Sequence, residues 1–447
     1  MSELKLFGTD GVRGRYGKYP VDETTSSKLG YLFATLVGHS SESADILIGR
    51  DTRISGSVLE CSFAKGVIAA GYTPVICGVI STPGLAKLLS NNQYAGGAMI
   101  SASHNPYFDN GFKFFGPSGQ KIVKSKINKI EEKLNDCESP IMLVKNLQDK
   151  VRFIDGASCY LNLINQKKKY TLEKIILDCA NGSLSQIADR FFEHGTCEFI
   201  TYGTKPDGFN INHLCGSTNI SFLQKEVLKK QADIGFAFDG DGDRLIMVDN
   251  SGAVLDGDDI LYVIARYMQN QDTLKGGVIG TELSNVGLEV ALNELEIPFV
   301  RTSVGDQNII KKLKDTKWAL GGEPSGHIII PDLEVFGDGL ICAGILLRII
   351  EYYGLPINQL VKGLTKRYQE NLDIETFNKD AIFNNQRLKD TVSQIENELD
   401  DKSRILVRPS GTEPKLRVLV ESDDPNLRAF VLKTMADQVE ALEKKIS

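Results

Sequence analysis

The feature that most constrains the fold is a pattern that occurs three times along the chain. In each copy, an apolar run ends in a polar, Gly-rich loop, and a second run with its own loop follows later. Short apolar runs bounded by turn residues and followed by helical patterns are typical of parallel α/β units. The first runs are ADILIGRDTR (44–53), EKIILDCANGS (173–183) and GGVIGTELSN (276–285), and the second are GGAMISASHNP (96–106), ADIGFAFDGDGDR (232–244) and WALGGEPSGH (318–327).

Because the order is the same in each copy, the pattern predicts three α/β domains of similar topology. After about residue 366 the chain is more charged, and a strand pair (404–422) and an amphipathic helix (427–445) follow. These features predict a smaller α+β domain at the C-terminus. One large α/β sheet with long insertions is the alternative that the pattern leaves open. We expect four domains, at residues 1–150, 151–252, 253–365 and 366–447.

The composition is that of a soluble globular protein, with 42% hydrophobic and 24% charged residues among 447. The net charge of −7 argues against a basic surface for nucleic acid. The N-terminus has no signal-peptide core, and no apolar run is long enough to span a membrane. The eight cysteines form no CxxC pair, which fits a reducing compartment. We therefore predict a cytoplasmic protein without nucleic-acid or membrane partners.

A candidate metal site follows the apolar run of the second repeat, where Asp239, Asp241 and Asp243 alternate with glycines. Carboxylates at this spacing can surround a hard cation such as Mg²⁺ or Ca²⁺. An EF-hand is disfavoured because Arg244 and Asn250 stand where that loop needs Gly and Glu. The alternative is a solvated acidic turn, but such close like charges repel one another without a cation. The end of a parallel strand is also where open α/β sheets bind ligands.

A candidate nucleophile, Ser103, lies in the segment SASHNP (101–106) of the first repeat. The segment does not have the G-x-S-x-G pattern of acyl-transfer enzymes. We expect His104 to be a poor base for Ser103, because the side chains of neighbouring residues diverge. The alternative interpretation is a turn that caps a helix, since Ser and Asn are common cap residues.

Two further loops have residues suited to binding a sugar phosphate. In RPSGTEP (408–414), hydroxyl and backbone N–H groups combine with arginine to favour an anion, although a hairpin turn with surface arginines is the alternative. The candidate phosphate ligands are Arg408, Ser410, Gly411, Thr412 and Arg417. In GGEPSGH (321–327), the candidate partners of sugar hydroxyls are Glu323, Ser325 and His327.

Cationic residues gather in the loops of the first repeat and indicate a local anion site, although each could be an ordinary surface residue. They are Arg13, Arg15, Arg50, Arg53 and Lys113. The other histidines, His39, His194 and His213, occur in no comparable cluster, and we assign them no role.

Together these loops resemble the alpha-D-phosphohexomutase family, and within it the bacterial branch that acts on glucosamine phosphates. The resemblance covers essentially the whole chain and implies three α/β domains of like topology and a smaller C-terminal domain around a central cleft. NINHLCGST (210–218) also resembles a segment of that branch. The matching segments, in the family's order, are FGTDGVRG (7–14), GRDTRISG (49–56), ISASHNPYFDNGFKFF (100–115), FDGDGDR (238–244), GGEPSGH (321–327) and RPSGTEP (408–414).

The resemblance implies that Ser103 is a phosphoserine that shares one Mg²⁺ with the three aspartates. It further implies a sugar-binding role for the 321–327 loop and a grip on the non-reacting phosphate by the 408–414 loop and Arg417. The remaining implied catalytic residues are Arg244, which would steady the phosphoryl group, His104, and the acid–base candidates Arg13 and Lys113.

The implied reaction interconverts glucosamine 6-phosphate and glucosamine 1-phosphate through a bound 1,6-bisphosphate, which also serves as activator. It would supply amino-sugar nucleotide and cell-wall precursor synthesis. The alternatives are a phosphomannomutase or phosphoglucomutase and, outside enzymes, a phosphosugar-binding protein without turnover. Two residues depart from the branch pattern: Pro324 replaces a usual Gln in the sugar loop, and Gln307 replaces a usual Arg. The sequence leaves the oligomeric state open, with a homodimer as one option.

Overall fold

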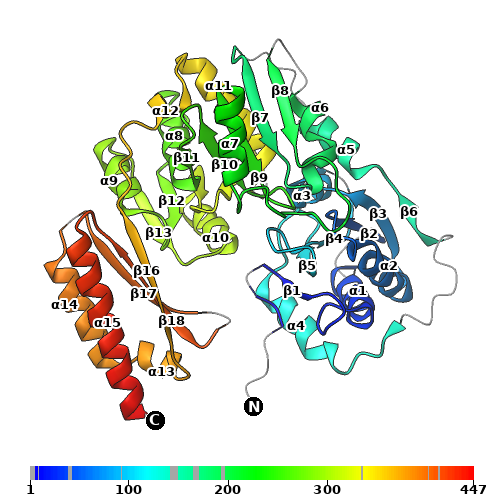
Figure 1. The fold of residues 1–447 in the computed structure, drawn as a ribbon. Coiled ribbons are helices and arrows are strands. Elements are labelled where there is room, and N and C mark those ends of the chain that lie inside the picture. Colours follow the sequence, from blue (N-terminus) through cyan, green and yellow to red (C-terminus); the bar gives the residue numbers. More distant parts are fainter. Residues whose placement is uncertain are drawn as a thin grey trace. The chain divides into compact units, whose positions relative to one another are not determined.

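The computed structural model divides into two compact units, which we describe separately (Figure 1). The first unit comprises Met1–Thr281 with Thr302–Val361, and the second comprises Glu282–Arg301 with Lys362–Ser447. The residues that the structure describes are 6–8, 10–38, 43–91, 93–140, 150–164, 171–192, 197–333, 336–400, 402–410 and 413–446.

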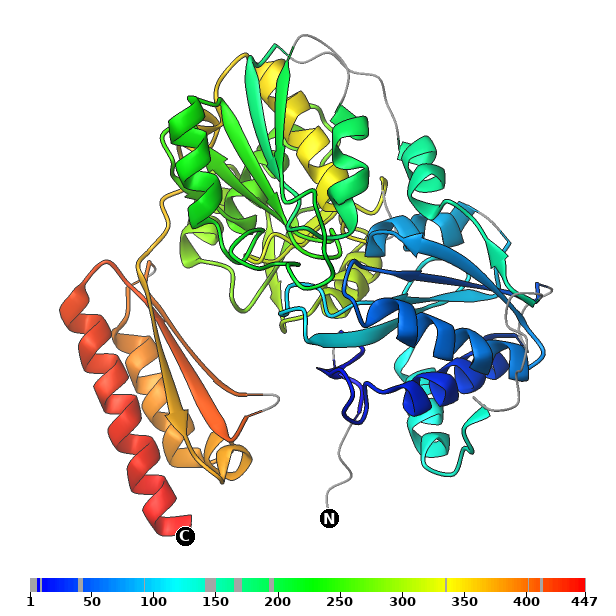
Figure 2. The same ribbon diagram turned by 45° about the vertical axis from the view of Figure 1, so that its right-hand side comes forward.

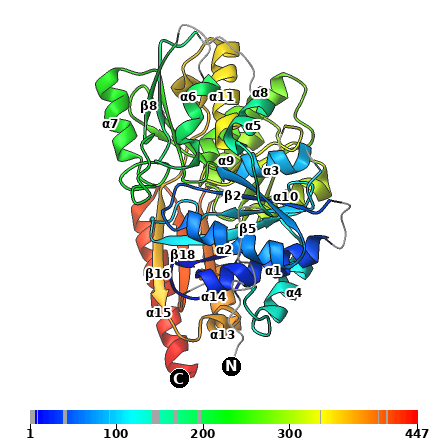
Figure 3. The ribbon, with the colours of Figure 1, turned by 90° about the vertical axis from the view of Figure 1, so that its right-hand side faces the viewer.

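The first repeat forms a mixed sheet with strand order β1-β5-β4-β2-β3-β6. Its central strands β2, β3 and β4 are parallel, whereas β5 is antiparallel to both β4 and β1. Helices α1 and α2 pack side by side (Figure 3). The elements are β1 (Val12–Arg15), α1 (Glu23–Gly38), β2 (Asp45–Arg50), α2 (Gly56–Ala69), β3 (Thr73–Val79), α3 (Thr82–Asn91), β4 (Gly96–Ile100), β5 (Asp109–Phe115), α4 (Lys124–Leu134), β6 (Arg152–Phe153) and α5 (Gly156–Ile164).

An aromatic cluster fills the core between these helices and the sheet. Phe33 of α1 stacks on Phe114 of β5 at 4.7 Å between ring centroids, and Phe63 of α2 stacks on Phe112 at 6.0 Å. Because side chains alternate along a strand, burial of Phe112 and Phe114 on one face of β5 directs Lys113 to the other face.

The second repeat has strand order β11-β10-β9-β7-β8. Strand β9 is parallel to β7, and β10 is antiparallel to β9. The elements are β7 (Lys174–Asp178), the 3-10 helix η3 (Ser183–Gln186), α6 (Ala188–Phe192), β8 (Glu198–Tyr202), α7 (Ser221–Lys230), β9 (Ile234–Phe238), β10 (Leu245–Asp249) and β11 (Val254–Leu255).

In the third repeat, β14 is parallel to β12 and β15 is antiparallel to β14. Helix α8 begins with a capping box, in which Asp256 and Asp259 each accept a backbone N–H of the first turn. The elements in the first unit are α8 (Gly257–Asn270), β12 (Val278–Thr281), α10 (Asp306–Thr316), β14 (Leu320–Gly322), β15 (Ile328–Ile329), α11 (Gly339–Tyr353) and α12 (Ile357–Leu360).

These registers confirm the predicted threefold repetition. Each first strand (β2, β7 or β12) pairs in parallel with the second strand of its repeat (β4, β9 or β14), and an antiparallel strand follows the loop. The loops after β4, β9 and β14 therefore occupy equivalent places. The helix-capping alternative for segment 101–106 is wrong, because that loop leads into strand β5. The domain boundaries at 150, 252 and 365 remain a proposal.

The second unit contains the predicted C-terminal α+β domain, an antiparallel sheet of order β16-β18-β17 covered by helices α14 and α15 (Figure 2). Its core includes Ile405, Val418 and Met435. The elements are α9 (Val286–Glu294), β13 (Phe299–Thr302), whose last residue belongs to the first unit, β16 (Gln369–Glu375), α13 (Lys379–Phe383), α14 (Gln386–Glu398), β17 (Arg404–Pro409), β18 (Lys415–Glu421) and α15 (Pro425–Ile446).

Two sequence expectations concern the chain as a whole. All eight cysteines are free thiols. Among the helices of the described residues, none combines the length and apolar character needed to cross a lipid bilayer.

Candidate active site

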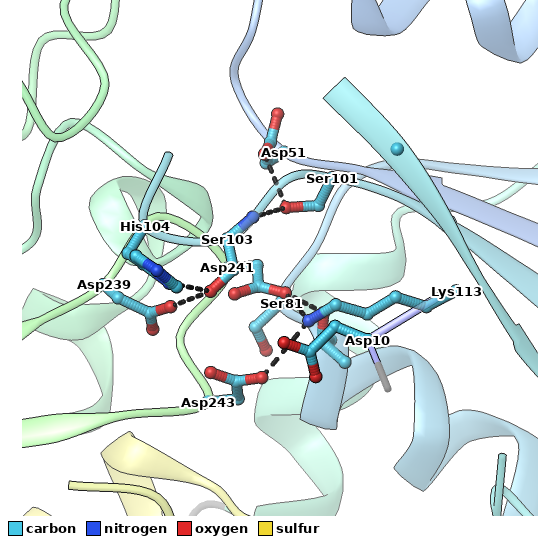
Figure 4. A network of polar contacts seen from close by, with 12 residues as sticks. Asp10, Asp51, Ser81, Ser101, Ser103, His104, Lys113, Asp239, Asp241 and Asp243 are labelled. Atoms are coloured by element: carbon cyan, nitrogen blue, oxygen red, sulfur yellow. Dashed lines mark hydrogen bonds and ion pairs between the residues drawn. The ribbon is translucent and has the colours of Figure 1, made fainter. Parts of the chain in front are cut away.

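Ser103 lies at the bend of the loop between β4 and β5, with a left-handed backbone φ of 51°. Its backbone N–H donates to Ser101 Oγ at 2.8 Å, and the Ser101 hydroxyl donates to Asp51 Oδ2 at 2.7 Å (Figure 4). A positive φ is unfavourable for a residue with a Cβ, so surrounding contacts must maintain it. The loop therefore presents Ser103 in a fixed, strained conformation.

The Ser103 hydroxyl reaches the aspartate loop of the second repeat. It donates to Asp239 Oδ2 at 2.6 Å, and the His104 Nδ1 atom lies 3.3 Å from the same oxygen (Figure 4). The expectation that the side chains of Ser103 and His104 diverge is therefore wrong, because the left-handed bend brings them together. Burial, with the nearby Arg244 and Arg13 charges, lowers the pKa of His104 to about 4.

Asp239, Asp241 and Asp243 converge as the sequence predicts. All three are buried, and one carboxylate oxygen from each lies within 4.8 Å of the others. Asp241 Oδ1 and Asp243 Oδ1 are buried without a hydrogen-bond partner among the described residues. Buried carboxylate oxygens without partners are costly, and oxygen ligands suit Mg²⁺. This donor set fits a divalent cation.

Lys113 supplies positive charge to this cluster. Its Nζ atom lies 2.5 Å from Asp241 Oδ2 and 3.2 Å from Asp243 Oδ2, and the Thr82 hydroxyl also donates to Asp241. Burial opposes ionisation of both groups, and the Asp243 charge also opposes it at Asp241. Lys113 and Thr82 together still lower the pKa of Asp241, and Lys113, His327 and Arg244 together lower that of Asp243. Burial and the two neighbouring carboxylates instead raise the pKa of Asp239 well above its usual range. The cluster thus holds more negative charge than one lysine compensates.

Glycines allow the aspartate loop to approach the serine loop. A Cβ added to Gly240 would lie 2.7 Å from the Ser103 carbonyl oxygen, and Gly242 has a φ of 75°. A side chain at either position would force the two loops apart or strain the backbone. The alternation of Asp and Gly therefore serves both the cation site and the contact between repeats.

The sugar-loop candidates lie beside the same site. Glu323 accepts the Gly305 N–H at 2.9 Å and the Ser325 hydroxyl at 3.2 Å. The buried His327 packs on Phe336, and its Nδ1 atom lies 3.9 Å from Asp243 Oδ1. A cavity of about 90 Å³ is lined by Asp10, Arg13, Asp243, Arg244, Val304, Gly305, Asp306, Glu323 and His327. The structure therefore joins these candidates to the metal loop.

Arg13 and Arg244 contribute cations to this cavity. Arg13 pairs with Asp10 at 3.1 Å, and its buried Nε atom has no hydrogen-bond partner among the described residues. The Arg244 backbone N–H donates to Asp239 Oδ1 at 3.2 Å, and its Nε atom lies 3.9 Å from Asp243 Oδ1. Both guanidinium groups are therefore placed to meet an anion in the cavity.

Three of the five cations predicted to form an anion site in the first repeat contact protein groups. Arg50 pairs with Glu60 at 3.3 Å, and Arg15 lies over the Phe108 ring at 5.1 Å. Arg53 is fully buried and donates to backbone carbonyls and to Asp51. All five N–H donors of Arg53 are taken by protein acceptors, and the anion-binding role of Arg15 and Arg50 stays a prediction.

The C-terminal candidates lie in the second unit. Arg408 of β17 and Arg417 of β18 are directly opposite each other in the sheet, and burial together with Arg417 lowers the pKa of Arg408. Arg417 pairs with Glu413 at 2.8 Å, and the Glu413 N–H donates to Ser410 Oγ at 3.2 Å. Gly411 and Thr412 lie outside the described residues. Two cations opposite each other in a sheet repel, which favours an anion beside them.

Several residues that complete the site were not singled out from the sequence. Thr82 begins α3, Asp306 begins α10 and pairs with Lys121 at 2.7 Å, and Ser101 links Ser103 to Asp51. Asp10, Asp51 and Ser101 belong to the motifs FGTDGVRG, GRDTRISG and ISASHNPYFDNGFKFF, so motif membership is the signal that could have indicated them. The others follow only from long-range contacts.

Comparison with known proteins identifies the family. Models of the phosphoglucomutase/phosphomannomutase family match in chain order: alpha/beta/alpha domain I at residues 4–140, domain II at 152–252, domain III at 256–368 and the C-terminal domain at 368–438. The phosphoglucosamine mutase of Histophilus somni strain 2336 is 41% identical over 446 residues, covering 98% of this chain and 99% of the relative. That of Pasteurella multocida strain Pm70 is 41% identical over 451 residues, covering 99% of this chain and 100% of the relative.

Solved structures share the fold at lower identity. A phosphoglucomutase/phosphomannomutase family protein from Burkholderia thailandensis superposes with a TM-score of 0.79 at 24% identity, covering 98% of this chain and 97% of that one. The N-acetylphosphoglucosamine mutase of Aspergillus fumigatus, solved with GlcNAc-6P and magnesium, gives 0.67 at 16% identity, covering 99% and 96%.

The fold and the full-length relatives define a phosphohexomutase, an enzyme of the isomerase class. The chain belongs to the phosphoglucomutase/phosphomannomutase family.

Proposed function

We propose that this chain interconverts glucosamine 6-phosphate and glucosamine 1-phosphate by way of phosphorylated Ser103. The observation that carries the proposal is the 2.6 Å contact between the Ser103 hydroxyl and Asp239, within the buried aspartate cluster. Relatives that match over their full length are phosphoglucosamine mutases, which supports glucosamine as the sugar. A cytoplasmic location remains a prediction from the sequence.

In the proposed reaction, a sugar hydroxyl attacks the phosphorus of phosphorylated Ser103. A bond forms between the sugar oxygen and phosphorus while the bond from Ser103 Oγ to phosphorus breaks. The sugar hydroxyl loses its proton and Ser103 Oγ gains one, which leaves a free serine and a sugar 1,6-bisphosphate. Reversal through the other phosphate restores phosphoserine and completes the isomerisation. A 1,6-bisphosphate from solution would phosphorylate unmodified Ser103, which explains its proposed role as activator.

Asp239, Asp241 and Asp243, with an oxygen of phosphorylated Ser103, would hold one Mg²⁺. The partnerless buried oxygens of Asp241 and Asp243 support this assignment. When bound, the ion supplies positive charge that stabilises the phosphoryl group during transfer. Lys113 adds a further positive charge beside two of the aspartates. Because positioning and charge stabilisation dominate phosphoryl transfer, this arrangement suits the chemistry.

The other site residues have proposed roles that follow from their placement. Arg244 and Arg13, at the cavity, would steady the transferring group. Three residues are candidates for proton transfer: Arg13, Lys113 and His104, whose Nδ1 atom lies next to Ser103 Oγ. Glu323, Ser325 and His327 would position the sugar, and the second unit would bind the non-reacting phosphate through Arg408, Ser410, Gly411, Thr412 and Arg417.

An assay with three substrates tests the proposed sugar. Glucosamine, glucose and mannose 6-phosphates are compared under saturating Mg²⁺ and 1,6-bisphosphate, and kcat/KM is measured for each. We expect the highest value with glucosamine 6-phosphate. A higher value with glucose or mannose 6-phosphate would instead identify a phosphoglucomutase or phosphomannomutase, for which Pro324 in the sugar loop is the motivating departure. No turnover with any of the three would contradict the proposal.

A further inference from the structure

Arg53 is a buried arginine that the proposed chemistry does not use. It follows β2 in the segment GRDTR, and its relative exposure is 1%. A guanidinium has five N–H donors in a rigid planar fork. Here five acceptors meet them: Asp51 Oδ2 at 2.8 Å and the backbone oxygens of Ser103 at 2.8 Å, Asn105 at 2.8 Å, Asp109 at 3.0 Å and Pro106.

Three of the four backbone acceptors belong to the loop that carries Ser103, and the fourth, Asp109, is the first residue of β5. Convergence of four carbonyls on one guanidinium therefore fixes the path of the loop from Ser103 to Asp109. The conformation of the nucleophile's loop is thus determined by a side chain from another strand–loop segment of the same repeat.

Asp51 completes this arrangement on the other side of Ser103. Its Oδ2 atom accepts from Arg53 Nε and from the Ser101 hydroxyl at 2.7 Å, and Ser101 Oγ accepts the Ser103 N–H. Asp51 also neutralises the buried guanidinium, which would be costly alone. The Ser103 peptide is consequently held at its N–H and at its C=O by one ion pair.

A second contact from another repeat acts on the same atoms. Asn212 Nδ2 donates to the Ser103 oxygen at 2.8 Å and to the Asn105 oxygen at 3.1 Å. Ser103 needs such restraint because its φ of 51° is unfavourable for a residue with a Cβ. Without it, the loop would relax and the hydroxyl would turn away from Asp239.

We propose that Arg53 is a positioning residue for phosphoryl transfer, which holds the Ser103 loop in the left-handed conformation that aims Oγ at the aspartate cluster. This inference rests on the proposed function of Ser103. It assigns to Arg53 an effect on the rate of transfer that is separate from substrate binding, because the guanidinium is saturated by protein acceptors.

Arg53→Lys tests the proposal, since lysine keeps the charge but offers three donors from one point instead of a five-donor fork. We expect kcat to fall about 100-fold, the scale of misplacing a reacting group by about 1 Å, while KM changes less than about twofold. Phosphorylation of Ser103 by glucose 1,6-bisphosphate, followed by intact-mass spectrometry, should slow by a similar factor. Arg152→Lys is the control, because this exposed arginine pairs with Asp45 away from the loop, and it should match the unchanged protein.

Three outcomes would overturn the proposal. The first is an Arg53→Lys enzyme whose kcat and phosphorylation rate lie within about threefold of the unchanged protein. The second is a rise in KM that alone accounts for the loss of kcat/KM. The third applies if Arg53→Lys does not fold: Asn212→Ala then decides, because it removes two donors from the same carbonyls, and an unchanged kcat in that variant contradicts the proposal.

The proposed function fails in a different way. If the unchanged protein neither turns over a hexosamine phosphate nor becomes phosphorylated on Ser103, the mutase proposal falls. If the unchanged protein is active and both variants match it, only the role of Arg53 falls.

Discussion

The aspartate loop of the first unit and the arginine loop of the second unit both gather like charges, but they do so in opposite ways. Asp239, Asp241 and Asp243 are buried, and Lys113 only partly balances them. Arg408 and Arg417 are opposite each other at the end of a sheet, where Glu413 and Asp373 lie close to Arg417. Each group of like charges predicts a ligand of the opposite charge, which is a cation at the aspartate loop and an anion at the arginine loop.

The two loops differ in how tightly they are packed and in how much of their charged side chains is exposed to solvent. The aspartate loop is packed against the Ser103 loop so closely that Gly240 has no room for a Cβ. Arg417 keeps about 40% of its side chain exposed, in an ion pair that solvent screens. We therefore expect changes at the first loop to alter the rate of the chemistry, and changes at the second to alter substrate affinity.

The largest effect should come from Ser103→Ala, which removes the oxygen that carries the phosphoryl group. We expect turnover to fall by more than about 10⁴-fold, as for loss of other covalent nucleophiles, with a native circular dichroism spectrum. A coupled assay with 1,6-bisphosphate present measures the loss. Ser90→Ala, on the exposed side of α3, is the matched control. Near-normal turnover of the Ser103 variant would contradict the proposal that phosphoryl transfer takes place at Ser103 beside the aspartate loop.

Removal of the cation should have the next largest effect. EDTA should reduce turnover to background and Mg²⁺ should restore it, because the neighbouring cationic side chains only partly balance the negative charge of the aspartates. Asp243→Asn should lower kcat by about 10²–10³-fold at saturating Mg²⁺, the scale of losing one major electrostatic contact. Asp437→Asn, on the exposed face of α15, serves as control. Full activity in EDTA would contradict the assignment of the first loop as a cation site.

A smaller effect should follow Arg417→Ala in the second unit. Loss of one charge-assisted phosphate contact corresponds to about 1.5–3 kcal/mol, so we expect KM for glucosamine 6-phosphate to rise about 10- to 100-fold while kcat changes little. Steady-state kinetics measure both values, with Arg387→Ala of α14 as an exposed control. A fall in kcat at constant KM would contradict the proposal that the arginine loop determines substrate affinity while the aspartate loop determines the rate of the chemistry.

The smallest effect concerns stability and should appear only without metal. Burial and the two neighbouring carboxylates raise the pKa of Asp239. At neutral pH the metal-free protein therefore loses stability at this residue, whether the carboxyl ionises against burial or takes up a proton on folding. Asp239→Asn should therefore raise the Tm in EDTA by about 2–4 °C and reduce the further rise that Mg²⁺ causes. The difference should vanish below the ordinary pKa of aspartate, where the carboxyl is protonated in both states. Differential scanning calorimetry measures it, and a lower Tm for the variant in EDTA would refute this view of the cluster.

The sequence predicted the parts of this molecule that depend on local pattern. Buried runs such as Ile234–Phe238 form strands as expected, and the Asp–Gly alternation places three carboxylates together. The direction of β5, β10 and β15 was not predicted, because side-chain periodicity is the same in parallel and antiparallel strands. The mixed sheets therefore had to be learned from the structure.

The parts that the sequence could not predict depend on residues distant in the chain or on backbone conformation. The contact between Ser103 and His104 results from a left-handed φ that nothing in SASHNP requires. The convergence of Thr82 and Lys113 on Asp241 joins segments more than 100 residues apart. From the sequence, Arg53 was grouped with the anion-binding cations. Most of its acceptors are backbone carbonyl oxygens, which every residue has, so the sequence does not indicate which of them an arginine will contact.

The threefold repetition has a consequence for how this enzyme fails under stress. Serine, cation ligands and sugar loop come from three copies of one hairpin, and no single copy holds a complete set. Local loss of structure at any one of these three loops would abolish catalysis, so heat inactivation should precede bulk denaturation. The least stable of the three loops should therefore set the temperature at which activity is lost.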